Sequence, residues 1–348
     1  MAETFQLPQR IDTHSHFLPP EYREELARNG HKNPDGMPAI PPWSLESHLE
    51  MMAEANVSKS ILSISSPGTH LVPGDDVLAR RLSRSCNAFA ASLKRAHPSK
   101  FGFWASLPLP DVHAALEEID IAHAEGADGF CLLTNFHGHY LGSKHLQPVF
   151  EKLNQIKATI FIHPTMPCIA CSSSGAASSA SVINATPLGS QHPIPLYEFL
   201  FDTARAVTNL FLSGTISRCP DIRLIIPHVG GALPPILSRF IGFSSVIPGG
   251  PLMSDVEVRG ALARQCYFDL AGFVFAGDEG GSGQLAALVK GYNIGYDRLL
   301  YGSDFPFTPG PAVRNFAVRM KNGLESIFSE EERREIYEGN AVKLLSSQ

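Results

Sequence analysis

The sequence predicts an α/β protein, a (β/α)8 TIM barrel, from two observations. Eight short apolar segments, each typical of a buried strand, alternate along the chain with segments of helix-like apolar spacing. Several of the apolar segments show no polar alternation, which suits parallel strands buried on both faces. The length of 348 residues fits two average domains or one large barrel. The regular alternation favours a single domain over residues 1–348.

The predicted strands follow one another at intervals that leave room for a helix between most of them. They are RIDTHSHF (10–17), KSILSIS (59–65), FGFWASLPL (101–109), GFCLLTN (129–135), TIFIHP (159–164), LIIPHVG (224–230), CYFDLAG (266–272) and LLYGSD (299–304). Helical spacing is clearest at 44–57, 112–127, 146–157, 198–218 and 329–345. The last helix has Ser329 as its expected N-cap, with Glu331 and Glu332 in the first turn.

Two segments interrupt the alternation. Residues 18–43 are rich in Pro and Gly, and residues 165–196 are rich in Ser and Ala. Long loops in a compact domain are uncommon unless they cover a site or are disordered. Both segments follow a strand with a candidate ligand, so we expect both at the mouth of the barrel. They are either lids or plain surface insertions.

Composition excludes several classes of function. The formal net charge is -6 and the pI is near 6.2, which argues against nucleic acid as the main partner. No apolar run is long enough to span a membrane, and the first residues lack a signal-peptide pattern. The six cysteines do not form a disulfide framework. These features predict a cytoplasmic protein with reduced thiols.

The chemistry is carried by polar residues at the carboxyl ends of predicted strands, which meet at one mouth in this fold. They are His14, His16, His163, His228 and Asp304. His14 and His16, two residues apart, share one face of a strand, so both imidazoles can reach one ion. Each histidine alone is explained as a polar cap on a strand. Together, four histidines and an aspartate at corresponding strand ends predict a metal site.

The residue types favour a single divalent ion. Three imidazoles and one carboxylate suit zinc, and manganese is also compatible. The fourth strand ends in Thr134 and Asn135 and offers no lysine to bridge two metals. We therefore expect one metal ion per chain.

The motifs DTHSH, FIHP, PHVGG and YGSDFPF together resemble those of the amidohydrolase superfamily. More narrowly, the chain is similar to the branch that contains aminocarboxymuconate-semialdehyde decarboxylase and the aromatic acid decarboxylases. The resemblance extends over nearly the whole chain. The segments IDTHSHFLPP and GMPAIPPWSLESHLEMM are most similar to fungal 6-methylsalicylate decarboxylases.

This resemblance implies roles for individual residues. It gives His14, His16, His163 and Asp304 as metal ligands, and His228 as a catalytic residue beside Asp304. Arg239 matches an arginine that enters a neighbouring subunit's site, which implies a homodimer or a larger homo-oligomer. A second arginine, which in the semialdehyde enzyme binds a substrate carboxylate, has no counterpart in GMPAIPPW. Its absence counts against a dicarboxylate semialdehyde as substrate.

The predicted reaction is the non-oxidative decarboxylation of a salicylate-type acid, with 6-methylsalicylate giving 3-methylphenol and carbon dioxide as the first choice. Either Asp304 supplies the ring proton, with His228 orienting it, or His228 activates a water. Ring contacts are expected from Phe17, Trp104, Phe136 and Phe305, although each also suits a core position. A different hydroxybenzoate, such as a dihydroxybenzoate or a carboxyvanillate, is an alternative substrate. The same residues also suit a metal-dependent lactone or amide hydrolase, or a non-catalytic metal-binding barrel.

Overall fold

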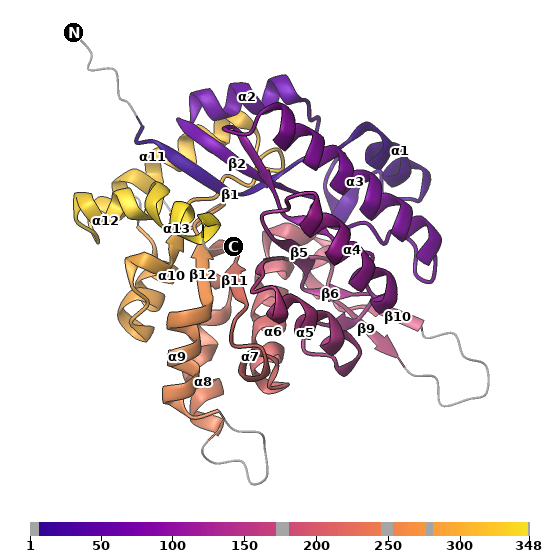
Figure 1. The fold of residues 1–348 in the computed structure, drawn as a ribbon. Coiled ribbons are helices and arrows are strands. Elements are labelled where there is room, and N and C mark those ends of the chain that lie inside the picture. Colours follow the sequence, from indigo (N-terminus) through magenta and orange to yellow (C-terminus); the bar gives the residue numbers. More distant parts are fainter. Residues whose placement is uncertain (1–6, 172–180, 245–252, 276–280, 347–348) are drawn as a thin grey trace.

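The computed structural model describes residues 7–171, 181–244, 253–275 and 281–346, and it contains the eight predicted strands as parallel neighbours (Figure 1). In chain order they are β1 (Arg10–His16), β2 (Val57–Ser63), β3 (Phe101–Phe103) with β4 (Ala105–Ser106), β5 (Phe130–Leu133), β8 (Thr159–His163), β11 (Arg223–Ile226), β12 (Cys266–Asp269) and β13 (Leu299–Leu300). The third predicted strand is divided at Trp104. Its first part pairs with β2 and its second part pairs with β5.

The ring of strands closes between the first and the last. The amide of Thr13 in β1 donates to the carbonyl of Tyr301, just after β13, at 3.0 Å. The amide of Asp304 donates to the carbonyl of His14 at 2.8 Å. Since the neighbouring strands elsewhere in the ring are also parallel, all strand carboxyl ends open on the same mouth.

The interior of the ring is filled by side chains. A buried apolar cluster takes its members from strands around the whole ring: Ile11, Ile61, Trp104, Cys131, Phe161, Ile225 and Leu300. Ala341 and Leu344 of the last helix, α13 (Asn340–Ser346), join this cluster. The barrel is therefore a packed core, with the site confined to its mouth.

Helices surround the ring (Figure 1). Those that follow the predicted strands are α2 (Leu45–Glu54), α3 (Asp76–Ala96), α4 (Val112–Ala124), α5 (Gln147–Gln155), α6 (Glu198–Leu212), α7 (Thr215–Arg218), α8 (Leu233–Ser244), α9 (Asp255–Gln265), α10 (Gly283–Ala286), α11 (Gly310–Glu325), α12 (Glu330–Arg334) and α13. The helix predicted over 198–218 is divided into α6 and α7. Gly214 has a φ of 74° there, and this left-handed conformation ends a helix.

The predicted N-cap at the C-terminal helix is confirmed. The Ser329 hydroxyl accepts from the Glu332 amide, and the Glu332 carboxylate accepts from the Ser329 amide, which forms a capping box. The segment then continues from α12 through a π-helical turn (Glu335–Gly339) into α13.

The two insertions contact each other. The first contains α1 (Pro20–Arg28) and the 3-10 turn η1 (Pro34–Gly36). The second contains a hairpin of β9 (Cys168–Cys171) and β10 (Ser181–Asn184), then η3 (Pro187–Ser190) and η4 (Ile194–Leu196). Residues 172–180 of this insertion lie outside the described part. The turn η1 packs against η4, and a Cβ on Gly36 would lie 3.5 Å from the Cα of Pro193.

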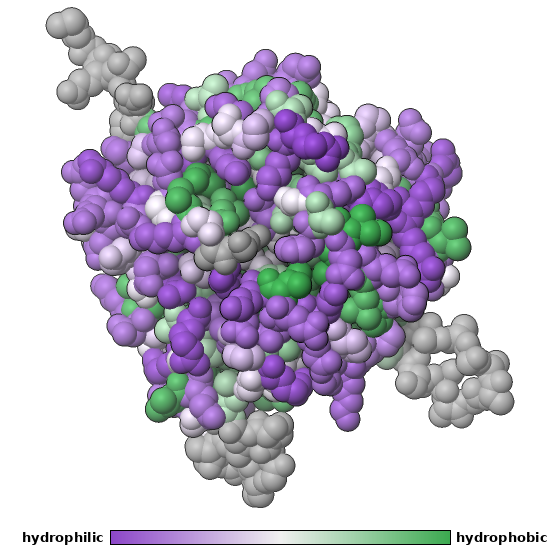
Figure 2. Space-filling model, in the orientation of Figure 1, coloured by the Kyte–Doolittle hydropathy of each residue, from purple (hydrophilic) through white to green (hydrophobic). Residues whose placement is uncertain are grey.

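The face of the molecule seen in Figure 2 is mostly polar. Figure 2 shows a largely hydrophilic face on which apolar side chains form small separate patches. Within the described residues, no helix has both the length and the apolar composition that a membrane crossing requires. The cysteines whose side chains are described are free thiols: Cys86, Cys131, Cys168, Cys219 and Cys266.

Candidate metal centre and substrate chamber

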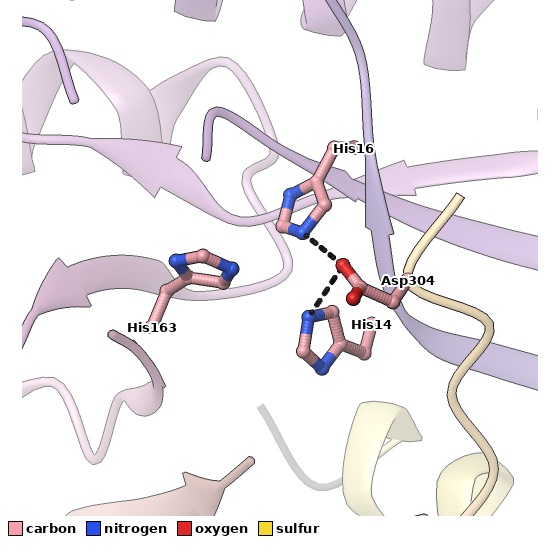
Figure 3. A group of neighbouring side chains, drawn as sticks. All are labelled: His14, His16, His163 and Asp304. Atoms are coloured by element: carbon pink, nitrogen blue, oxygen red, sulfur yellow. Dashed lines mark ion pairs between the residues drawn. The ribbon is translucent and has the colours of Figure 1, made fainter. Parts of the chain in front are cut away.

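Four side chains from three separate strand ends converge at the mouth of the barrel (Figure 3). His14 and His16 lie in β1, His163 ends β8, and Asp304 follows β13. One potential ligand atom from each lies within 4.8 Å of all the others. The Asp304 Oδ1 is 3.5 Å from Nε2 of His14 and 3.3 Å from Nε2 of His16. The structure thus brings together the four residues that the sequence proposes as ligands.

The ring orientation of two of these histidines is fixed by acceptors on the other nitrogen. His14 Nδ1 lies 2.9 Å from Asp269 Oδ2, and His163 Nδ1 lies 2.7 Å from the Pro164 carbonyl oxygen. Both partners are acceptors, so each Nδ1 carries the hydrogen in the neutral ring and each Nε2 keeps its lone pair. A backbone carbonyl or a carboxylate in this position is typical of metal-binding histidines.

His16 is oriented in a similar way by a serine. Its Nδ1 lies 2.9 Å from the Ser63 hydroxyl, which itself donates to the Ser15 carbonyl at 3.2 Å. The hydroxyl oxygen therefore accepts from Nδ1, and Nε2 again keeps its lone pair. The buried Nε2 atoms of His14 and His16 have no hydrogen-bond partner among the described residues. Uncompensated buried nitrogens that point at one carboxylate fit a metal ion between them.

The electrostatics of the cluster also suit a bound cation. Burial raises the pKa of Asp304, but the interactions of its carboxylate with His14 and His16 outweigh the effect of burial and hold that pKa well below the ordinary value. Burial lowers the pKa of His14, but Asp269 and Asp304 raise it to about 10. Burial, then the neighbouring His16 and His14, hold the pKa of His163 well below its usual range. The carboxylates of Asp269 and Asp304 therefore stabilise a positive charge on the imidazole cluster. A divalent ion bound there can take the place of the proton on His14.

The backbone around the site is conformationally demanding. Asp304 has a φ of 58° and His228 a φ of 52°, in the left-handed region that residues other than glycine rarely adopt. Such conformations persist where the surrounding structure enforces them, often at functional sites. Close packing contributes, because a Cβ on Gly302 would lie 2.8 Å from the Cβ of His14 and 3.0 Å from the Cβ of Ala271.

His228 lies beside the four candidate ligands, and Asp269 positions it. The His228 amide donates to Asp269 Oδ1 at 3.0 Å, and its Nδ1 donates to the Ala271 carbonyl at 3.1 Å. The rings of His228 and His14 are 4.9 Å apart. Gln284 holds the same loop by donating to the carbonyl of His228 at 2.7 Å. His228 therefore has a fixed tautomer and a fixed place at the site.

Asp269 is a residue of the candidate site that the sequence reasoning missed. It is fully buried at the end of β12 and links His14 to the loop of His228. The sequence contains a pattern that could have identified Asp269. The segment CYFDLAG places an aspartate at the end of a predicted strand, as LLYGSD does for Asp304. The partners lie far away in sequence, so only the fold shows which atoms it contacts.

A chamber of about 210 Å³ opens beside the cluster. His163, His228 and Asp304 provide one part of its wall. The rest is mostly apolar, and both insertions contribute to it: Met37, Pro195, Leu196, Phe199, Leu200, Phe273, Val274 and Phe307, with Asp35, Ser65, Ala271, Gly272, Gln284 and Thr308. A cavity of about 150 Å³ already holds benzene. The chamber can therefore hold one substituted aromatic ring.

The ring contacts expected from the sequence lie elsewhere. The described residues that line this chamber do not include Phe17, Trp104, Phe136 or Phe305. Trp104 is in the barrel interior, Phe17 and Phe305 belong to the core between ring and helices, and Phe136 lines a second cavity of about 280 Å³. The aromatic side chains that line the chamber are Phe199 of helix α6, Phe273 and Phe307.

Arg239 lies on α8, outside the chamber of its own chain, with an exposed side chain. It does not contribute to the lining formed by the described residues of the same chain. The expected role in a neighbouring subunit's site is compatible with this position.

Comparison with known proteins identifies the family. The chain matches the amidohydrolase family over residues 11–346. It is 36% identical to the decarboxylase yanB of Aspergillus niger, over 97% of this chain and 87% of the relative. It is 34% identical to the 6-methylsalicylic acid decarboxylase of Penicillium expansum, over 97% and 96% of the two chains. The chain belongs to the amidohydrolase family.

Solved structures share the fold. A crystal structure of an amidohydrolase II superposes with a TM-score of 0.82 at 30% identity, covering 97% of this chain and all of that one. A dihydroxybenzoic acid decarboxylase from Polaromonas sp. JS666, with bound manganese and the inhibitor 2-nitroresorcinol, superposes with a TM-score of 0.75 at 20% identity. That comparison covers 98% of this chain and 97% of the Polaromonas chain.

Proposed function

We propose that this chain is a metal-dependent, non-oxidative decarboxylase of a salicylate-type aromatic acid, and that 6-methylsalicylate, giving 3-methylphenol and carbon dioxide, is its substrate. The observation that carries the proposal is the cluster of His14, His16, His163 and Asp304 beside a ring-sized, mostly apolar chamber. The fungal relatives, which include a 6-methylsalicylic acid decarboxylase at 34% identity, support the choice of substrate.

The four residues would hold one divalent ion. The Nε2 lone pairs of the histidines and the carboxylate of Asp304 form a mixed nitrogen and oxygen set that suits zinc or manganese. Zinc is our first choice from the three imidazoles, and the manganese in the Polaromonas structure makes manganese the second. When bound, the ion would act as a Lewis acid that orients the substrate and draws charge from its carboxylate and phenolate oxygens.

The chain's own residues would supply the proton that the reaction needs. Protonation of the ring carbon that bears the carboxylate interrupts aromaticity. The bond to the carboxylate then breaks, its electron pair restores the ring, and carbon dioxide leaves. A donor must therefore contact the ring at that carbon. Asp304 and His228 both line the chamber. We propose that Asp304, an anion in the free site, first takes up a proton that it shares with His228 and then donates it to the ring carbon, while His228 orients it.

The chamber walls would assist by excluding water. Phe199, Phe273 and Phe307 would hold the ring, and the apolar surroundings favour loss of the carboxylate charge. The insertions 18–43 and 165–196 would act as lids, because Met37 from the first and Leu196 from the second line the same chamber. Arg239 would complete the site of a second subunit in a homodimer, and the enzyme would work in the cytoplasm.

The test is product analysis on purified protein with 6-methylsalicylate, before and after chelation and metal add-back. We expect 3-methylphenol and carbon dioxide in equal amounts, lost on chelation and restored by zinc or manganese. Turnover of a dihydroxybenzoate or a carboxyvanillate, without turnover of 6-methylsalicylate, would correct the substrate. Hydrolysis of a lactone or an amide, without release of carbon dioxide, would replace the decarboxylase by a hydrolase.

A further inference from the structure

A buried acid in the chamber wall has no part in the proposed reaction. Asp35 lies in η1 of the first insertion, is 8% exposed, and lines both the chamber and the adjoining 280 Å³ cavity. Among the described residues, no Lys or Arg forms an ion pair with it. Unpaired buried carboxylates are costly, so their presence in a cavity wall points to function.

The backbone conformation of Asp35 is a second unfavourable contribution to the stability of the folded chain. Asp35 has a φ of 53° in the left-handed region, and the packing of η1 against η4 holds it over the chamber. Burial raises the pKa of the Asp35 carboxyl to about 6, against a smaller lowering by a hydrogen bond with Ser66. Near pH 8 the group is therefore an anion in the wall of the chamber, and no Lys or Arg among the described residues pairs with it.

The charge balance of the chamber indicates what this anion does. Its titratable lining consists of Asp35, His163, His228 and Asp304, and no Lys or Arg lies among the described lining residues. A divalent ion with the Asp304 carboxylate carries one net positive charge. One substrate carboxylate balances that charge, and a phenolate oxygen on the same ion would already leave the site negative. Among the described lining residues, a second carboxylate would meet the anion of Asp35 and no Lys or Arg, since the side chains that do not titrate are apolar apart from Ser65, Gln284 and Thr308.

We propose that Asp35 is a specificity-determining residue that confines the chamber to aromatic acids with a single carboxylate. The inference rests on the proposed function, because it takes the metal cluster as the site of the first carboxylate. It adds the class of acids that the enzyme rejects and the residue that rejects them. Like charges in a partly buried chamber repel strongly enough for a difference in affinity of about tenfold or more.

The experiment measures binding of matched ligands by calorimetry at pH 8, with the full chain loaded with metal. Salicylate is the monoacid probe. The diacids 2-hydroxyterephthalate and 4-hydroxyisophthalate carry the same salicylate group and a second carboxylate across the ring. The corresponding primary amides are neutral ligands of nearly the same size, so the ratio of diacid Kd to amide Kd isolates charge from size.

The variant is Asp35→Asn, because asparagine has nearly the same shape and tolerates a left-handed φ. We expect the ratio of diacid Kd to amide Kd to fall about tenfold or more for at least one pair, while salicylate affinity changes less than about threefold. The matched control is Asp120→Asn, whose carboxylate is 66% exposed and pairs with Lys152 outside the barrel. That variant should leave the ratio unchanged. Asp35→Gly, which also suits the left-handed φ, replaces Asp35→Asn if the latter fails to fold.

The outcomes separate this inference from the proposed function. An unchanged ratio in the Asp35 variants, or a wild-type chain that does not bind salicylate, overturns the role of Asp35. A ratio that changes in the Asp35 variants, together with no release of carbon dioxide from 6-methylsalicylate, supports the role of Asp35 in specificity and contradicts the proposed decarboxylase function. Thermal unfolding of Asp35→Asn gives an independent readout. We expect its Tm to equal or exceed that of the wild type, and a clear decrease would indicate a structural role instead.

Discussion

Replacement of Asp269 by asparagine should weaken metal binding without unfolding the chain. The wild-type carboxylate uses Oδ2 for His14 Nδ1 at 2.9 Å and Oδ1 for the amides of His228 and Ala271 at 3.0 and 3.1 Å. Asparagine has only one acceptor oxygen. If that oxygen serves the two amides, the side-chain NH2 faces His14 Nδ1. His14 must then adopt the tautomer with its hydrogen on Nε2, and that nitrogen no longer has a lone pair with which it could bind a metal ion.

The opposite orientation of the asparagine is also costly. With the oxygen toward His14, the NH2 group would face the amides of His228 and Ala271, and two buried donors would lose their acceptor at about 1–3 kcal/mol each. The first orientation is therefore expected. Loss of a carboxylate behind a metal-binding histidine typically lowers metal affinity 10- to 100-fold. This corresponds to about 1.4–2.7 kcal/mol of binding free energy.

The assay is a competition titration of zinc and of manganese against a chromophoric chelator, with circular dichroism to confirm folding. The matched control is Asp12→Asn. Asp12 is equally buried, and its Oδ1 accepts from the amides of His14 and Ser303 at 3.2 and 3.0 Å, but among the described residues it forms no hydrogen bond or ion pair with an imidazole. The asparagine oxygen can serve both amides, so affinity should stay within about threefold. Wild-type metal affinity in folded Asp269→Asn would refute the reasoning about the His14 tautomer.

Three further predictions concern packing, pH and assembly. Gly302→Ala should displace His14, since the new Cβ would lie 2.8 Å from the Cβ of His14, and this displacement should lower kcat/KM about tenfold or more. The control is Gly310→Ala, where no atom lies within 4 Å of the new Cβ, and it should leave kcat/KM unchanged. Burial, then the charge of His16, lowers the pKa of His48 to about 3. The unfolded chain then binds more protons below pH 6.5, so stability should fall as the pH falls from 6.5 toward 3, by up to about 3 kcal/mol at pH 4. His48→Gln should flatten this slope in pH-dependent denaturant unfolding, and an unaltered slope would exclude His48 as its source. If Arg239 completes the site of a neighbouring subunit, Arg239→Ala should abolish activity and keep the metal. Mixing this variant with a chain inactivated by His228→Ala should then restore activity, because the second chain still supplies Arg239. Loss of stability with full activity would contradict that role.

Much of the fold followed from local patterns. Each predicted strand is a strand in the structure, because an uninterrupted apolar run between polar or glycine-containing segments is the direct signature of a buried parallel strand. The boundaries were less accurate where one residue alters the backbone. Gly214 divides a predicted helix, and Trp104 marks the point where a strand changes its pairing partner. Neither effect is visible in an average over several residues.

The candidate site was predictable to the extent that strand ends determine it. His14, His16, His163 and Asp304 were proposed because parallel strands in a barrel open at one mouth, and the structure brings them within 4.8 Å. The ring contacts were not predictable in this way. Phe17 and Trp104 are near ligand positions in sequence or register but point into the core. The rings that line the chamber belong to loops and helices whose orientation depends on packing.

The sequence by itself determined the barrel and placed four candidate ligands and His228 at one mouth, because these features depend on periodicity and on residue type at strand ends. Only the tertiary structure decided which ring nitrogen faces the metal position, that Asp269 orients His14 from a strand more than 250 residues away, and that Asp35 lies in the chamber wall. These features depend on hydrogen bonds and packing between segments that are distant along the chain. Such contacts cannot be inferred from the local sequence. They form only when the barrel closes and the two insertions pack against each other over its mouth.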